Sequence, residues 1–278
     1  MSVTVMLGGS LSEIGPALES AIHITKRMKT TLTGLCALPD PATSAVYVTG
    51  AEGIVISATA IQSLADAQDK LVQNYKQVFT DQTVDAGSWL QADFKKETGS
   101  VALYGAAAAS LSDAFILPKE ATQSTHALNA AFEHVLMEAR LPLVLAPREV
   151  KTSDTCLIAW DDSPLAARAV RLHMPLIRSY KKVVIVQNSK GIRHQWSKAC
   201  EGSKDHLTEL LREEQLEVSD IEMSGPVSTS LLNAAQNSDA SLIVMGAYGH
   251  NRIGQMLLGG TTSKLLHDNT APALALCR

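Results

Sequence analysis

Long apolar runs are missing from this sequence of 278 residues. None approaches the roughly 18 residues that a helix needs to cross a bilayer, so we expect no membrane partner. The chain starts with Met1 and enters a strand-like run at Val3, without the basic and apolar segments of a secretory signal. We therefore expect a cytoplasmic protein.

An excess of positive charge is also missing, because 24 lysines and arginines stand against 28 acidic residues and the net charge is −4. Without a basic stripe, nucleic acid is not an expected partner. The four cysteines occur singly, which is typical of small buried side chains and not of a disulfide or metal framework. The eight histidines form no metal-ligand motif. We predict no metal site and no catalytic residues.

Similarity between the two halves of the chain indicates a tandem repeat. Three pairs of short segments match: residues 112–117 with 238–243, residues 141–146 with 271–276, and residues 4–10 with 157–163. A chain of this length suits two domains, which we predict at residues 1–150 and 151–278.

Strand-like apolar runs alternate with helical segments in each half, a pattern typical of parallel βαβ units. Five strands in each half predict two flavodoxin-like, doubly wound α/β domains with the strand order 3-2-1-4-5. A long helix is expected over residues 58–79. The expected strands lie at residues 3–7, 31–38, 83–93, 114–117 and 142–146, and at 155–160, 182–188, 216–223, 241–245 and 272–277.

The most informative segment, GAYGHNRIGQMLLGGTTS, covers residues 246–263 and follows an apolar run. A run rich in Leu, Ile and Val is typical of a strand buried on both faces. Gly246 and Gly249 then break this strand, since glycine tolerates the dihedrals of a sharp exit. The chain therefore leaves the sheet at this point through a glycine-rich loop.

The loop ends in a second glycine pair, Gly259 and Gly260, followed by TTSKLL at residues 261–266. We interpret these six residues as the start of a helix. Free backbone N–H groups and the positive end of the helix dipole then lie beside a loop without side chains, an arrangement that suits phosphate.

A second strand end carries two carboxylates. Residues 154–160 (DTCLIAW) form the expected strand, and Asp161, Asp162, Ser163 and Pro164 follow it. Helix capping is the simpler role for Asp162 and Ser163, because Ser before Pro is typical of an N-cap and first helical position. In the order 3-2-1-4-5 this corner lies at the same sheet edge as the glycine-rich loop.

The spacing of the glycines, with two and then nine residues between them, and the Asp-led corner resemble the nucleotide site of the universal stress protein family. The resemblance implies an adenine nucleotide alpha hydrolase-like fold, ATP as ligand with or without Mg²⁺, at most slow hydrolysis, and a stress-response or regulatory role. By this resemblance Asp161 contacts the base and ribose. Two residues depart from the family pattern: Gly260 stands where Ser or Thr is usual, and Asp162 where Gly is usual.

Gly260 has no hydroxyl group, so a hydroxyl can bind the ligand here only if Thr261 or Thr262 supplies it. His250 lies within this glycine-rich sequence, beside Arg252. A positive side chain there is equally suited to contact phosphate oxygens and to remain in solvent. The candidate nucleotide contacts are Asp161, Val186, Gly246, Gly249, His250, Arg252, Gly259, Gly260, Thr261 and Thr262.

The first half lacks these features. Gly8 and Gly9 stand where the second half has its two carboxylates, and residues 118–124 contain no glycine. The offset between matching positions grows from 126 at Asp113 to 130 at Pro142, so the first half is four residues shorter here. We predict one nucleotide per chain, bound by the second half.

The fifth strand of each half is an apolar run at a sheet edge, and an exposed apolar edge favours pairing. We expect the two to pair as an intramolecular pseudo-dimer, and association into a homodimer through other faces is left open. Two other functions remain open. One is an adenylyl- or phosphoryl-transferring enzyme with His250, Arg252 and Lys264 as a basic clamp; the other is a structural pairing protein with a vestigial loop.

Overall fold

A computed structural model describes residues 2–43, 58–187, 203–247 and 260–278. The first half contributes the strands β1 (Ser2–Met6), β2 (Thr31–Leu38), β3 (Ala92–Thr98), β4 (Ala114–Pro118) and β5 (Leu143–Ala146). The second contributes β6 (Thr155–Trp160), β7 (Lys182–Gln187), β8 (Glu217–Glu222), β9 (Ala240–Gly246) and β10 (Ala273–Cys277).

Helices connect and cover these strands. In the first half they are α1 (Leu11–Met28), α3 (Ala58–Ala86), α4 (Val101–Leu111), η2 (Lys119–Thr122), α5 (Asn129–Glu133) and η3 (His134–Glu138). In the second half they are α6 (Pro164–Leu172), α7 (Met174–Ile177), α9 (Ser203–Glu213), α10 (Val227–Asn237) and α11 (Gly260–His267).

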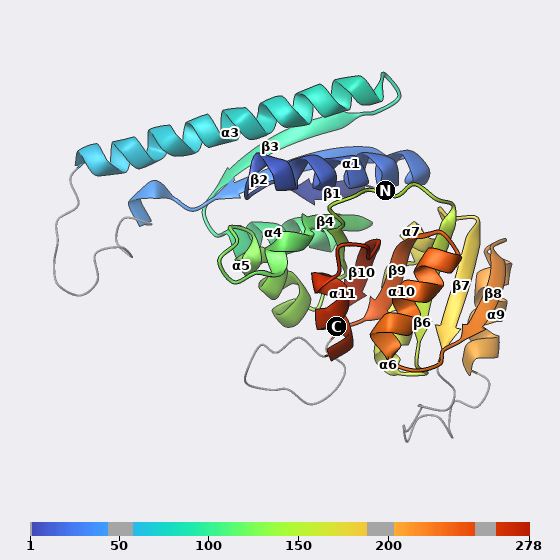
Figure 1. Cartoon of the computed structure of the whole chain (residues 1–278). Helices are drawn as coiled ribbons and strands as arrows, with labels where there is room; N and C mark the ends of the chain where they lie inside the picture. The colour runs from blue at the N-terminus through green and yellow to red at the C-terminus, as the bar shows by residue number, and fades with distance from the viewer. Residues whose placement is uncertain (1, 44–57, 188–202, 248–259) are drawn as a thin grey trace.

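All ten strands belong to one sheet, in the order β3-β2-β1-β4-β5-β10-β9-β6-β7-β8 (Figure 1). Each half therefore has the strand order 3-2-1-4-5 expected from the sequence, and pairing within each half is parallel. The two five-stranded parallel sheets expected from the sequence join through their fifth strands, β5 and β10, as predicted, and so form one continuous sheet. Its centre is an antiparallel pair in which Leu274 of β10 lies opposite Leu145 of β5.

Helices cover both faces of the sheet, and each face has its own apolar core. In the first half α1 and α3 lie on one face and α4 and α5 on the other (Figure 1). Side chains alternate between the two cores along each strand, so Val5 packs with Leu18 of α1 while Met6 packs on the opposite face. Burial on both faces explains the continuous apolar runs of the central strands.

The expected strand at residues 83–93 was wrong. Helix α3 continues to Ala86, and β3 begins only at Ala92. The sequence ADFKKET of β3 has no apolar run, because this strand forms a sheet edge and most of its side chains are exposed. The helix expected over residues 58–79 exists and is longer than predicted.

Helix α3 is bound to the rest of the molecule mainly through its C-terminal part, where Val72, Tyr75 and Phe79 are buried. Its N-terminal end projects beyond the sheet in Figure 1. Within the described ranges, no helix has both the length and the apolar character that crossing a membrane requires.

Candidate functional site

The corner after β6 is built by a capped helix start. Ser163 is the N-cap of α6, its Oγ accepts a hydrogen bond from the Ala166 N–H at 3.1 Å, and Pro164 begins the helix. The capping role expected for Ser163 is therefore confirmed. Asp161 is exposed, and its Oδ1 accepts a hydrogen bond from the Ser163 N–H at 3.0 Å. This bond fixes the carboxylate at the carboxyl end of β6.

Asp162 has a left-handed backbone, with φ at +58°. Glycine is favoured in this conformation, and Asp is among the few other residues that tolerate it. The Asp162 carboxylate accepts hydrogen bonds from Trp160 Nε1 at 2.7 Å, from Gln187 Nε2 at 3.1 Å and from the Ser203 hydroxyl. Asp162 therefore does not cap α6 as expected; it joins β6, β7 and the start of α9.

The main chain at Gly246 packs directly against the start of α6. A Cβ atom at this position would lie 3.0 Å from Leu165 Cβ and 3.3 Å from the Ala166 nitrogen. Among the described residues, positive φ values at glycine occur at other positions, and Gly246 is still within β9. Its role here is close packing, and the sharp strand exit that the sequence suggested does not occur at this residue.

The start of α11 confirms the helix expected after the second glycine pair. Gly260 is the first helical residue and is exposed, Thr261 is half-buried, and Thr262 is buried. A Cβ atom on Gly260 would have no neighbour within 4 Å among the described residues. Leu265 and Leu266 pack into the core beneath, beside α10. The exposed first turn therefore offers backbone N–H groups to an anion.

These two features share one edge of the sheet. β6 and β9 are parallel neighbours with Ile158 opposite Val244, so their last residues, Trp160 and Gly246, end together. A helix that connects parallel strands runs back across the sheet, so α11, which precedes β10, starts at this same edge. The structure thus brings the Asp161 corner, the end of β9 and the α11 N-terminus to one edge.

The other candidates are placed differently. Gly249, His250, Arg252 and Gly259 lie outside the described residues. Val186 is fully buried, and its side chain packs in the core between the sheet and the helices α10 and α11. Its backbone is paired with β6 and β8, so Val186 offers no open surface to a ligand.

In the first half, Leu128 and Tyr75 lie against the glycines that follow β1, and a cavity of about 320 Å³ lies between the start of α1 and the ends of β4 and β5. Leu128 packs over Gly8 so closely that a Cβ atom on Gly8 would lie 2.7 Å from Leu128 Cδ2. Tyr75 donates a hydrogen bond from its hydroxyl to the Gly9 carbonyl oxygen at 2.7 Å. The segment that follows β4 forms η2, and its first three residues are buried.

A buried lysine connects this segment to the second half. The Lys119 ammonium donates a hydrogen bond to the carbonyl oxygen of Asp268, just after the end of α11. Burial lowers the pKa of Lys119, although the nearby carboxylates of Asp268 and Glu120 oppose that shift. A cation at this end of the helix complements the negative end of its dipole.

Of the two carboxylates at the corner after β6, only that of Asp161 is exposed and could contact a metal ion. Both Asp162 oxygens already accept hydrogen bonds, which leaves Asp161 as the exposed carboxylate. Across the described ranges, no group of three or more His, Cys, Asp or Glu side chains is placed to hold a metal ion.

Residues 152–276 match the model of the Universal stress protein family. The chain therefore contains a Universal stress protein domain in these residues. The matched region includes both strand ends of the edge described above, and the left-handed backbone of Asp162 gives a physical reason for the glycine that is usual there. A search of the curated proteins found no match.

Solved structures extend the similarity over the whole chain. A universal stress protein from Archaeoglobus fulgidus DSM 4304 covers 100% of this chain, and 98% of that protein is covered, with a TM-score of 0.66 and 16% identity. A functionally unknown protein from Pseudomonas aeruginosa PAO1 has a TM-score of 0.49 and 15% identity, with coverages of 99% and 92%. At 16% identity, the first similarity shows that both halves share the fold.

Two site elements were missed by the sequence analysis. The network of Asp162 with Gln187 and Ser203 joins residues far apart in the chain, and only the unusual Asp at a glycine position indicated it. The Lys119 contact had no sequence signal, because a lysine followed by the mostly polar residues 120–125 (EATQST) is ordinary surface composition.

Proposed function

We propose that the second half of this chain binds one molecule of ATP and that the protein acts as a nucleotide-dependent regulator in the cytoplasmic stress response. The phosphates lie at the start of α11, where Gly260 is exposed. Asp161 contacts the sugar and base from the end of β6. This assignment combines the family of residues 152–276 with the geometry of one sheet edge.

The observation that carries the proposal is the contact of Gly246 with the first turn of α6. Because a side chain at Gly246 would collide with Leu165, the end of β9 lies directly on the corner that holds Asp161. A ligand at this edge can therefore contact both strand ends, as ligands do at the switch point of doubly wound sheets. In the first half, Leu128 and Tyr75 lie against Gly8 and Gly9, which stand where the second half has Asp161 and Asp162, and this supports a single site.

The electrostatic basis is a helix N-terminus facing an anion. Free N–H groups and the helix dipole favour phosphate without needing a cationic side chain. Mg²⁺ enters this proposal as a companion of the phosphates, which would supply most of its oxygen ligands, with Asp161 as the available protein carboxylate. The Asp162 carboxylate, held by three donors, belongs to the protein framework.

Calorimetric titration with ATP and Mg²⁺ tests the proposal. We expect a stoichiometry near one per chain. Gly249→Val, which places a branched side chain in the glycine-rich loop, should abolish binding with little loss of stability. Asp161→Ala should weaken it about tenfold, as expected for a hydrogen bond that involves a charged group. Asp66→Ala removes an exposed carboxylate from α3 and is the matched control.

Each alternative outcome has a definite meaning. A stoichiometry near two would contradict the assignment of a single site to the second half. The absence of binding in the wild-type protein would contradict the nucleotide assignment. Mass spectrometry of ligands released from the purified, denatured protein adds an independent check: ATP or ADP supports a nucleotide regulator, whereas a conjugated metabolite indicates a transferase.

A further inference from the structure

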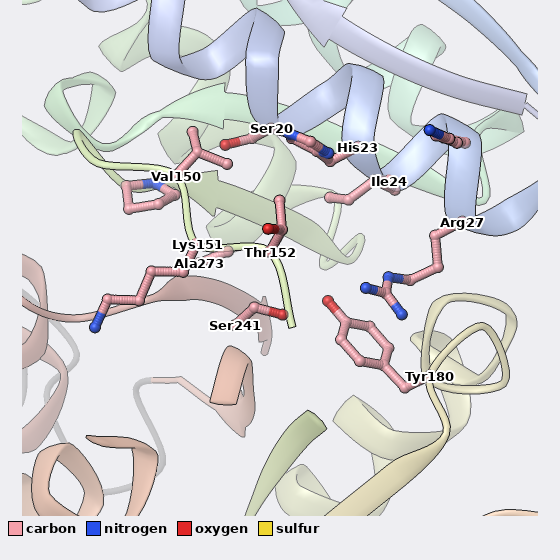
Figure 2. Close-up of a pocket in the computed structure, with 12 residues that line it drawn as sticks. Ser20, His23, Ile24, Arg27, Val150, Lys151, Thr152, Tyr180, Ser241 and Ala273 are labelled. Carbon is pink, nitrogen blue, oxygen red and sulfur yellow. The ribbon is translucent and has the colours of Figure 1, made fainter. Parts of the chain in front are cut away.

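Apart from the candidate nucleotide site, a cavity lies between the two halves of the chain. Its volume is about 180 Å³, and its wall is formed by α1, residues 147 and 150–152, Tyr180, and the first residues of β9 and β10. Figure 2 shows Ser20, His23 and Arg27 along α1, with Thr152 and Tyr180 across from them. Both halves therefore contribute to one concave surface that is open to solvent.

This cavity is distinct from the candidate nucleotide site. Ser241, in its wall, is near the beginning of β9, whereas Gly246 ends the same strand. Five residues of extended strand separate them by about 16 Å. The volume corresponds to roughly six water molecules, which is too small for a nucleotide. A ligand of about five to eight non-hydrogen atoms fits this space.

The charged side chains that line the cavity are all basic. Its ionisable side chains at neutral pH or below are His23, Lys26, Arg27 and Lys151, and no Asp or Glu is among the residues that line it. Two acids contact this group from outside the wall: Glu19, whose carboxylate lies 3.8 Å from His23 Nε2, and Asp154, which is bound by Arg27 and by Lys181. The wall therefore favours an anion over a cation.

Ser20 supplies an unsatisfied donor. Its side chain is 4% exposed, and its Oγ has no hydrogen-bond partner. Hydroxyls inside helices usually bond to the carbonyl oxygen four residues earlier, and Thr25 on the same helix does so, to Ala21 at 2.7 Å. Ser20 does not make that bond. A buried hydroxyl without a partner is unfavourable, so a ligand oxygen in the cavity would be stabilised by it.

The cationic side chains differ in their freedom. Arg27 is fixed: it donates hydrogen bonds to Asp154 and to the carbonyl oxygens of Ser153 and Ser179, and its guanidinium lies 4.3 Å from the Tyr180 ring centroid. Lys151 is exposed, and its ammonium has no partner in the described part of the chain. It extends away from α1 in Figure 2, and its long stem allows it to turn toward a bound anion.

We propose that this cavity binds a small oxyanion, either inorganic phosphate or a short-chain carboxylate, between the two halves of the chain. The Ser20 hydroxyl donates a hydrogen bond to the anion, Lys151 closes over it, and the fixed positive charge of Arg27 favours it from the wall. The bound anion contacts α1 and the amino ends of β9 and β10 together. Its binding therefore stabilises the packing of one half on the other.

The test is thermal unfolding of the full chain during titration with sodium phosphate and, separately, sodium acetate, at constant ionic strength maintained with sodium chloride. We expect a saturable rise in the melting temperature with one or both anions. Ser20→Val should weaken the apparent affinity about tenfold, because it removes a hydrogen bond to a charged group. Lys151→Gln should weaken it about threefold. A response to phosphate alone, or to acetate alone, identifies the anion class.

Two controls separate this site from others. Lys182→Gln removes an exposed charge outside the cavity and should leave the response unchanged. Gly249→Val should also leave it unchanged, because Gly246 and Gly260, the described residues on either side of Gly249 in the chain, are at the opposite sheet edge. The proposal is overturned if neither anion gives a saturable response. It is equally overturned if Ser20→Val and Lys151→Gln respond like the wild type, or if Gly249→Val abolishes the response that Ser20→Val retains.

Discussion

The main chain of Gly246 lies against Leu165, so closely that a Cβ atom on Gly246 would be 3.0 Å from Leu165 Cβ and 3.1 Å from its carbonyl carbon. The carbonyl carbon belongs to the first turn of α6 and cannot rotate away as a side chain can. The distance between β9 and the corner that carries Asp161 therefore depends on the absence of a side chain at residue 246.

Gly246→Ala should therefore destabilise the protein although alanine is small. We expect the free energy of unfolding in urea to fall by about 1–3 kcal/mol, the usual cost of overpacking. Gly260→Ala is the matched control, because its Cβ atom meets nothing within 4 Å and its effect should stay within about 0.5 kcal/mol. Equal stability of Gly246→Ala and the wild type would show that the packing relaxes at no cost.

The same open space at Gly260 allows a test of the nucleotide site. Gly260→Ser restores the hydroxyl that the family pattern has at this position, without a steric conflict among the described residues. We expect ATP to bind about threefold to tenfold more tightly than in the wild type, as one added hydrogen bond allows. Calorimetry of Gly260→Ala, which adds only a methyl group, provides the comparison. If both variants bind alike, the hydroxyl does not contact the phosphates.

The sequence predicted the strand order because the central strands are buried on both faces. Runs such as ASLIVMG in β9 and TCLIAW in β6 are apolar for that reason, and their alternation with helices is unambiguous. β3 was misplaced because its edge position removes the need for apolar side chains. Local composition therefore identified the core and failed at this edge, whereas β8 at the other edge, expected at residues 216–223, lies at Glu217–Glu222.

The candidate site was predictable to the same extent. Ser163 and the start of α11 follow from local rules of helix capping and glycine use. The buried state of Val186 and the partners of Asp162 depend on the packing of β7 and α9 against the corner, which no short-range pattern contains.

Asp162 combines a left-handed backbone with three hydrogen bonds, and substitutions can separate the two. Asp162→Ala removes the hydrogen bonds and tolerates the positive φ poorly, so we expect a decrease of about 3 kcal/mol in the free energy of unfolding. Asp162→Gly also removes the hydrogen bonds but accepts the positive φ, so it should be more stable than the alanine variant by about 1 kcal/mol. Chemical denaturation gives both values. If Asp162→Ala were more stable than Asp162→Gly, the positive φ at residue 162 would not destabilise a residue that has a side chain.

Buried His173 should make stability depend on pH. Its Nε2 donates a hydrogen bond to the carbonyl oxygen of Leu276 at 3.1 Å, and burial lowers its pKa from 6.5 to about 4. Between these values the unfolded chain binds a proton that the folded chain does not. The difference in pKa therefore contributes about 3 kcal/mol to the free energy of unfolding. This contribution is complete above pH 6.5 and is lost as the pH falls toward 4.

Urea unfolding at pH 7, 6 and 5 measures this dependence. His173→Gln retains a donor for Leu276 but cannot titrate, so its stability should change less over the same interval than that of the wild type. Parallel curves for the two proteins would assign the pH dependence to other groups.

The pairing of β5 with β10 gives the last prediction. β10 is bonded on one side to β9 and on the other to β5, where Leu274 lies opposite Leu145 and Leu276 opposite Leu143. Leu274→Pro in the full chain should remove a ladder hydrogen bond at the centre of the sheet and lower the free energy of unfolding by roughly 3 kcal/mol or more.

Residues 154–278 expressed alone would leave the apolar edge of β10 unpaired, and an unpaired edge is a template for another strand. We expect this half to dimerise at micromolar concentration in sedimentation equilibrium. A stable monomer would show that the β10 edge does not need a partner strand.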